Sequence, residues 1–117
     1  MVRTGLAFWR NDHPWIVLTD PVPTSGNILC VNLTTFDAEC VDDECILEPK
    51  DYAWIKHPTA VAFSFAQSYD VKKLEMAITK GLLKLAHPSD IPAATLKKIR
   101  SIAKTARELS PDLKALL

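Results

Sequence analysis

The sequence predicts an α+β fold that is mainly β: a small antiparallel barrel followed by C-terminal helices. Two observations support this fold class. Aliphatic and β-branched runs are separated by turn-forming segments in the first half of the chain, and apolar residues take a helical spacing in the second half. Strands followed by helices are typical of a barrel or sheet with helices packed at one side. A chain of 117 residues suits one domain, so we treat residues 1–117 as a single unit.

Two apolar runs, Trp15–Thr19 and Ile28–Leu33, predict the central strands. The residues between them, 20–27, include proline, glycine, serine and asparagine, which are typical of turns. We therefore expect the two strands to pair antiparallel. Shorter apolar segments predict two further strands, at Leu6–Trp9 and at Cys45–Leu47.

A fifth strand is predicted at Ala60–Ala66, where large and small side chains alternate. Successive side chains of a strand point to opposite faces, so we expect the large ones to share one buried face. They are Val61, Phe63 and Phe65.

Two helices are predicted after the strands. The first begins after Asp70 and ends at Gly81, where glycine suits a left-handed helix end; its apolar face comprises Val71, Leu74, Ala77 and Ile78. The second begins near Pro92, with Ser89 and Asp90 as candidate caps, and the Ser110-Pro111 pair is expected to stop it. We expect it to bury Leu96, Ile99, Ala103 and Ala106.

Formal net charge is zero, but the charges are unevenly distributed. Between Asp37 and Asp51 seven acidic residues accompany one lysine, which predicts a solvated, anionic loop region. Between Lys72 and Lys114 ten basic residues accompany four acidic ones. A basic face attracts phosphates, but a lysine-rich helix is more often simply a solvated face, so charge alone identifies no partner.

The three cysteines, Cys30, Cys40 and Cys45, include no CxxC pair, and their odd number favours a reducing compartment, so we expect a cytoplasmic protein. A zinc site formed by Cys40, Cys45 and His57 lacks a fourth ligand, and we predict no metal and no cofactor. No apolar segment approaches the roughly 20 residues that span a bilayer, so no membrane partner is expected.

Two motifs resemble the MazF/PemK (Kid-like) toxins of bacterial type II toxin-antitoxin systems. In that family Arg-Pro precedes an aliphatic strand, and a later strand ends in a hydrophobic residue followed by Thr-Thr or Thr-Ser. Here His13-Pro14-Trp15-Ile16-Val17-Leu18 is similar to the first motif, and Cys30-Val31-Asn32-Leu33-Thr34-Thr35 to the second. The order of the remaining elements, with Lys80-Gly81 and a C-terminal helix, extends the resemblance over most of the chain.

This resemblance implies an SH3-like barrel, a homodimer, metal-independent cleavage of single-stranded RNA, and an antitoxin protein as inhibitory partner. It also implies two catalytic positions, an arginine and a threonine. The threonine corresponds to Thr34, whereas His13 occupies the arginine position. Asn32 stands where the family commonly has proline.

RNA cleavage without a metal needs a base for the 2′-hydroxyl, an acid for the leaving 5′-oxygen and a donor to the phosphate. Histidine acts as base or acid near neutral pH. Our hypothesis is that His13 transfers a proton, Thr34 hydrogen-bonds the phosphate and Arg10 supplies positive charge. Without the resemblance, His13 is more simply a histidine that bonds to the turn before a strand, and Thr34 a turn residue.

His57 precedes Pro58 as His13 precedes Pro14, and closure of the barrel would allow the two histidines to form an acid/base pair. The alternative is a plain loop histidine. His87 also precedes a proline, and we expect it to be structural. For RNA binding the candidates besides Arg10 are Thr35, Trp54 and Lys56, whereas tryptophans of small domains are more often core residues.

Three classes of function therefore remain open. The first is a toxin-like endoribonuclease. The second is a barrel that binds RNA or a protein without chemistry, which the missing arginine favours. The third is an interaction module whose partner docks between barrel and helix and which has no affinity for nucleic acid.

Overall fold

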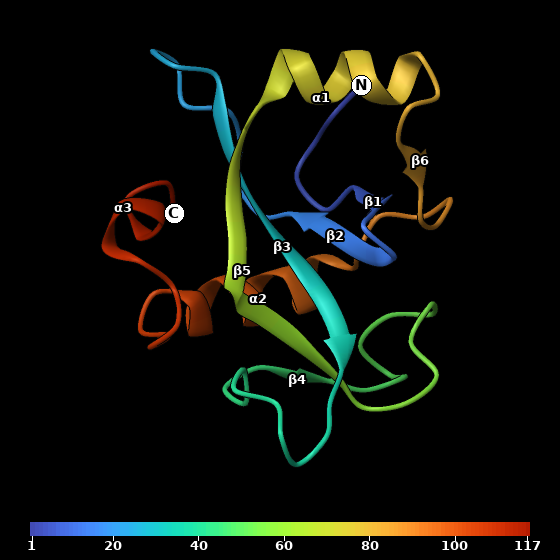
Figure 1. Ribbon diagram of the computed structural model, residues 1–117, viewed down its shortest axis with the longest axis vertical. Coiled ribbons are helices and arrows are strands. Elements are labelled where there is room, and N and C mark those ends of the chain that lie inside the picture. Colours follow the sequence, from blue (N-terminus) through green and yellow to red (C-terminus); the bar gives the residue numbers. More distant parts are fainter.

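The computed structural model describes all residues, 1–117, as one six-stranded antiparallel sheet with three helices (Figure 1). In the sheet the strands follow the order β4-β5-β3-β2-β1-β6. The elements are β1 (Ala7–Arg10), β2 (His13–Val17), β3 (Asn27–Thr35), β4 (Ile46–Leu47), β5 (Thr59–Asp70), α1 (Val71–Thr79), β6 (Lys84–Leu85), α2 (Ala93–Ala103) and α3 (Pro111–Lys114).

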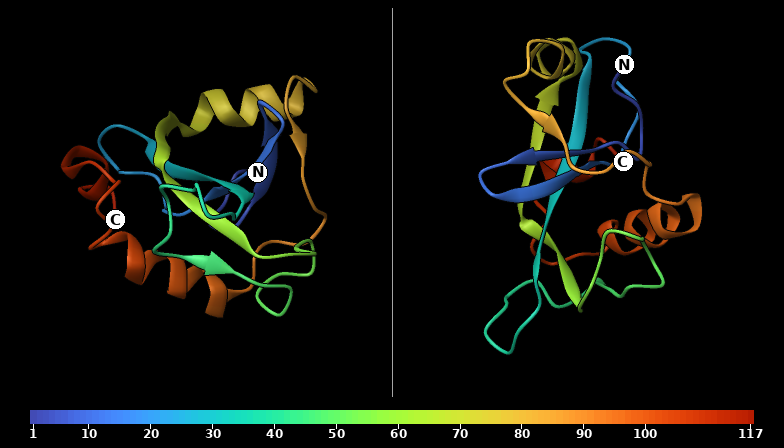
Figure 2. Two further views of the ribbon diagram at one scale, coloured as in Figure 1. Left: turned by 60° about the horizontal axis from the view of Figure 1, so that its bottom comes forward. Right: turned by 90° about the vertical axis from the view of Figure 1, so that its right-hand side faces the viewer.

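The sheet is not closed into a barrel, so the expectation of a barrel is wrong in this respect. β4 and β6 form the two edges, each is only two residues long, and each pairs with a single neighbour, β5 and β1 respectively. Helices cover the sheet instead: α1 lies over one face, and α2 and α3 lie over the other (Figure 2, left). The predicted helices therefore do not pack at one side only.

Each face of the sheet has its own apolar core, because successive side chains of a strand point to opposite faces. The core on the α2 side is the larger and includes Ile16, Val31, Leu33 and Ile99. The core on the α1 side is built around Phe8, Trp15, Ile28, Cys30 and Leu74. A nine-residue β3 buried on both faces lies at the centre of the fold.

The predicted strands are present, and the central two pair antiparallel as expected, with Trp15 opposite Asn32 and Val17 opposite Cys30. β3 and β5 are longer than predicted. β6 was not predicted, since Lys84 and Leu85 are both exposed and form no apolar run.

β5 bends about halfway along its length (Figure 1), where its register to β3 shifts. Cys30 lies opposite Gln67 and Asn32 opposite Ala62, so the four residues Phe63–Ala66 face only Val31. Extra residues of a bulge move the following side chains to the other face of the sheet. Phe65 is therefore 63% exposed, and the prediction that it shares the buried face of Val61 and Phe63 is wrong.

Asp42 holds this bulge in place. Its carboxylate oxygens accept hydrogen bonds from the backbone N–H of Ser64, at 2.9 Å, and from the Ser64 hydroxyl, at 2.5 Å. Asp42 is only 4% exposed, so the prediction of a solvated acidic loop region is wrong at this residue. The bulge leaves the Ser64 N–H without a strand partner, and a buried carboxylate is a strong acceptor for it.

Helix α1 has the predicted ends. The Asp70 carboxylate caps it by accepting from the backbone N–H groups of Lys72 and Lys73 at 2.9 and 3.2 Å. Gly81 follows the last turn with φ of +75°, a left-handed conformation that favours glycine. None of the three helices is long and apolar enough to cross a membrane.

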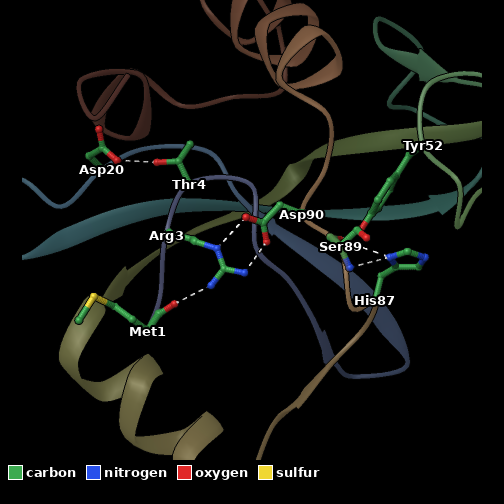
Figure 3. Close-up of polar contacts among 8 residues, drawn as sticks. All are labelled: Met1, Arg3, Thr4, Asp20, Tyr52, His87, Ser89 and Asp90. Atoms are coloured by element: carbon green, nitrogen blue, oxygen red, sulfur yellow. Dashed lines mark hydrogen bonds and ion pairs between the residues drawn. The ribbon is translucent and has the colours of Figure 1, made fainter.

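Helix α2 begins near Pro92 as predicted, but its capping and its end differ from prediction. Its N-cap is Pro92, without a side-chain hydrogen bond, and Asp90 instead pairs with Arg3 through two contacts of 2.7 and 2.9 Å (Figure 3). The helix ends at Ala103, and Ser110-Pro111 starts α3 rather than stopping α2. Serine at the N-cap followed by proline is a common helix start. Ile99, Ala103 and Ala106 are buried as predicted; Leu96 is half-buried.

Candidate active site

Helix α1 covers only one end of its face of the sheet, and the other end is open. Residues directly opposite each other in an antiparallel pair point to the same face. Arg10 lies opposite His13, and Trp15 lies opposite Asn32. The side chains of Arg10, His13, Asn32 and Thr34 therefore gather on the uncovered end of this face, on three neighbouring strands.

Two hollows meet at this end of the sheet, and His13 and Thr34 line both. The first, which we name the rim hollow, has a volume of about 200 Å³ and is also lined by Trp9, Thr35, Trp54 and His57. The second, the face hollow, has a volume of about 310 Å³ and is also lined by Arg10, Trp15, Asn32, Phe65 and Gln67. The structure thus brings His13, Thr34 and His57 to one hollow, although the sheet does not close.

His13 is half-buried and held in one tautomer. Its Nδ1 lies 3.2 Å from the backbone carbonyl oxygen of Leu33. A carbonyl oxygen only accepts, so Nδ1 carries the hydrogen and donates it. In the neutral ring Nε2 then has the free lone pair and is the nitrogen able to accept a proton.

His57 comes from the loop between β4 and β5 and is exposed. Its Nδ1 lies 3.2 Å from the carbonyl oxygen of Pro58, which fixes the ring in the same way. The hydroxyl of Thr59 donates to the carbonyl oxygen of His57 at 2.9 Å and orders the loop at the start of β5. Two imidazoles, those of His13 and His57, therefore line the rim hollow.

Arg10 faces the other hollow. Its Cζ atom lies 5.7 Å from the centroid of the Trp15 ring and 5.5 Å from that of Tyr69, within cation–π range. The Trp15 indole N–H donates to the carbonyl oxygen of Arg10 at 3.0 Å. Burial raises the pKa of Tyr69, and the neighbouring Arg10 lowers it in part. No carboxylate forms an ion pair with Arg10, so its charge is available to an anion beside His13 and Thr34.

The remaining predicted residues lie at the edge of the site. Trp54 is half-buried and packs edge to face with Trp9, with ring centroids 5.8 Å apart. Thr35 is exposed at the end of β3. Lys56 is exposed and lines a third hollow, next to His57 and His87, away from Arg10.

The contacts of His87 are those of a structural loop residue. Its Nδ1 accepts from the backbone N–H of Ser89 at 3.0 Å, and its ring lies 5.3 Å from that of Tyr52 (Figure 3). The Tyr52 hydroxyl in turn donates to the carbonyl oxygen of Ser89 at 2.7 Å. Burial, followed by repulsion from Asp90, raises the pKa of Tyr52 to about 12.

The three cysteines are free thiols, and no three side chains of the metal-binding types converge. Burial raises the pKa of Cys30, which is fully buried. Burial likewise raises the pKa of Cys45, to about 11. Neither thiol lies at the candidate site.

Sequence reasoning missed Phe65 and Gln67 as site residues, and it noted Asn32 only as a departure from a motif. The alternation in β5 assigned Phe65 to the core, because a bulge has no periodic signature. The one available signal was Ser64, a polar residue between two phenylalanines. Asn32 is 5% exposed, and its Oδ1 atom is buried without a hydrogen-bond partner.

Comparisons of the chain with protein-family models, with curated proteins and with solved structures give no match.

Proposed function

We propose that this protein is a toxin-like endoribonuclease that cleaves single-stranded RNA without a metal ion. The observation that carries the proposal is the hydrogen bond from His13 Nδ1 to the Leu33 carbonyl, which leaves Nε2 as a proton acceptor beside Thr34. These two residues belong to the strand motifs that resemble the MazF/PemK toxins: His13 begins the first motif, and Thr34 lies near the end of the second.

In the proposed mechanism His13 Nε2 takes the proton of a ribose 2′-hydroxyl. The 2′-oxygen attacks the adjacent phosphorus, and the bond from phosphorus to the 5′-oxygen breaks. His57, protonated, gives its proton to the leaving 5′-oxygen. The products are a 2′,3′-cyclic phosphate and a 5′-hydroxyl, and the two histidines exchange their protonation states.

Thr34 and Arg10 stabilise the negative charge of the RNA and transfer no proton. The Thr34 hydroxyl donates to a non-bridging oxygen of the scissile phosphate, where charge develops. Arg10, which lines the face hollow, attracts the phosphate of the neighbouring nucleotide. The RNA-binding surface extends from the rim hollow to the third hollow, away from Arg10, and includes Thr35, Trp54 and Lys56.

Further parts of the proposal depend on the family resemblance alone. They are the relationship of the open sheet to SH3-like barrels, the formation of a homodimer, and an antitoxin protein that inhibits the enzyme. A cytoplasmic location is proposed from the three free thiols.

A test of the proposed function is to incubate the purified protein with a long, mostly unpaired RNA in excess EDTA. His13→Ala and Thr34→Ala are prepared identically, and Thr24→Ala, in the exposed loop between β2 and β3 and outside all three hollows, serves as the matched control. The proposal is supported if the parent and Thr24→Ala cleave the RNA and both other variants do not. RNA that stays intact throughout would refute it.

A second candidate function is RNA binding without cleavage. It is favoured by the replacement of the family's arginine with His13 and by the face hollow, which is a binding surface with no further acid or base. Intact RNA together with salt-sensitive binding would identify this function. Absence of binding would leave the third class, an interaction module for a protein partner.

A further inference from the structure

The face hollow contains an unsatisfied polar group at its base. Asn32 is 5% exposed, and its Oδ1 atom has no hydrogen-bond partner in the protein. A buried polar atom without a partner costs free energy of folding, so such atoms are rare in native proteins. At this position an unpaired carboxamide can form its hydrogen bonds with a ligand in the hollow.

An aromatic wall stands beside this carboxamide. The bulge in β5 turns Phe65 out of the core, and it lines the hollow with 63% of its surface exposed. A large apolar ring held at the surface by a buried Asp42–Ser64 contact is a platform on which a flat ring can stack. Trp15 lies on β2, which is separated from β5 by β3, and it lines the hollow on the side opposite Phe65.

The rest of the lining is uncharged or basic. Gln67 contributes a second carboxamide and Asn11 a third. Arg10 is the one side chain of the lining that carries a charge at every pH. No acidic side chain lines the hollow. A volume of about 310 Å³ lies at the small end of ligand pockets, which suits one nucleotide rather than a larger ligand.

We infer that the face hollow is a base-reading subsite, in which one unpaired nucleobase stacks on Phe65 and hydrogen-bonds to the carboxamides of Asn32 and Gln67. A carboxamide offers a donor and an acceptor side by side, whichever way it is turned, and the edge of a nucleobase presents the same pair. A bare phosphate presents no donor and leaves the Asn32 oxygen unsatisfied.

This inference deepens the proposed function, on which it rests, by naming what selects the cleavage position. His13 and Thr34 line both hollows, so a base in the face hollow lies next to the phosphate at the rim. The nucleotide at the cleaved bond, or its neighbour, is then chosen by the contacts of Asn32.

The test measures binding of four 2′-fluoro homo-hexanucleotides, one for each base, to the full-length protein in EDTA. These probes lack the attacking hydroxyl and stay intact, so binding is separated from cleavage. We expect one base to bind at least about tenfold more tightly than the weakest. Asn32→Ala abolishes this preference, and Phe65→Ala weakens all four by about tenfold, the lower range of stacking on an aromatic side chain.

Matched controls come from the same elements. Asn27→Ala, at the other end of β3, and Phe36→Ala, just after it, remove the same side chains outside the hollow and leave the preference unchanged. Asn32→Ala keeps or raises the melting temperature, because its side chain has no partner to lose. A large fall in its melting temperature would show a structural role and overturn the inference.

The outcomes separate this inference from the proposed function. Base-selective binding that depends on Asn32, with no cleavage of ordinary RNA, supports the subsite and refutes the nuclease. Cleavage without base preference, or with a preference that Asn32→Ala leaves intact, supports the nuclease and overturns the subsite. If no hexanucleotide binds, the inference is overturned and the hollow accepts a different class of ligand.

Discussion

The carboxylate of Asp42 accepts both the backbone N–H and the hydroxyl of Ser64, at 2.9 and 2.5 Å, and this contact fixes where Phe65 points. Asp42 belongs to the acidic loop between β3 and β4, and Ser64 to the bulge of β5. A residue 22 positions away in the chain thus determines which face of the sheet the aromatic wall of the site occupies.

We expect Asp42→Ala to destabilise the protein by about 1–3 kcal/mol, because the Ser64 N–H loses its partner in the bulge. Urea denaturation measures the change in the free energy of unfolding. Glu39→Ala is the control, since its exposed side chain forms no hydrogen bond, and it should shift stability by less than about 0.5 kcal/mol. Equal stability of the two variants would contradict the assigned role of Asp42.

The sheet and most strand positions could be predicted from the sequence because apolar runs and turn residues are local signals. The β2–β3 pair and the end of α1 at Gly81 are examples. The bulge at Phe63–Ala66 could not be predicted in this way, because it depends on a contact with Asp42 far along the chain. The Ser110-Pro111 pair has the chemistry of a helix start, but it followed a helical pattern and was assigned as an end.

The candidate site was predictable in part. The two motifs located His13 and Thr34, and the structure places both at the same two hollows. The barrel closure that was expected to bring His57 near them does not occur; a loop delivers His57 to the rim hollow instead. Phe65 and Gln67 reach the site only through the bulge, so the face hollow had no sequence signature.

The thiols should differ in reactivity in the folded protein. Cys30 and Cys45 are buried, and burial raises the pKa of both, whereas Cys40 is partly exposed. We expect a thiol reagent at pH 8 to modify one cysteine per folded chain and all three after unfolding in denaturant. Cys40→Ser should leave none reactive in the folded state; rapid reaction of a second thiol would contradict the burial.

The protein should lose stability in alkaline solution. The folded-state pKa of Tyr52 is raised to about 12 from the ordinary value of 10.0, so the unfolded chain loses its proton first. The stabilising contribution is complete below pH 10 and falls as the pH rises toward about 12. The raised pKa values of Tyr69 and of the two buried thiols act in the same direction.

Denaturation at a series of pH values, with tyrosinate absorbance recorded in parallel, measures this effect. Tyr52→Phe should cost about 1 kcal/mol at neutral pH, because the bond to the Ser89 carbonyl is lost. The same variant should flatten the alkaline decline. A decline as steep as that of the parent would show that Tyr52 does not cause it.

His57 is assigned as the acid that protonates the leaving 5′-oxygen. His57→Ala should therefore lower the rate of RNA cleavage by about 10²- to 10⁴-fold, because the leaving oxygen loses its proton donor. The initial rate of cleavage of an unpaired RNA by the variant and by the parent measures the effect. Equal rates would exclude His57 from the proton transfer.

The chemistry of the product ends tests the central claim most directly. RNA is cleaved in excess EDTA, and the ends are identified by mass spectrometry alongside a substrate with 2′-deoxyribose at the cleaved position. If His13 activates the 2′-hydroxyl, the products carry a 2′,3′-cyclic phosphate and a 5′-hydroxyl, and the deoxy linkage stays intact. Ends with a 3′-hydroxyl and a 5′-phosphate, or cleavage of the deoxy linkage, would contradict the account.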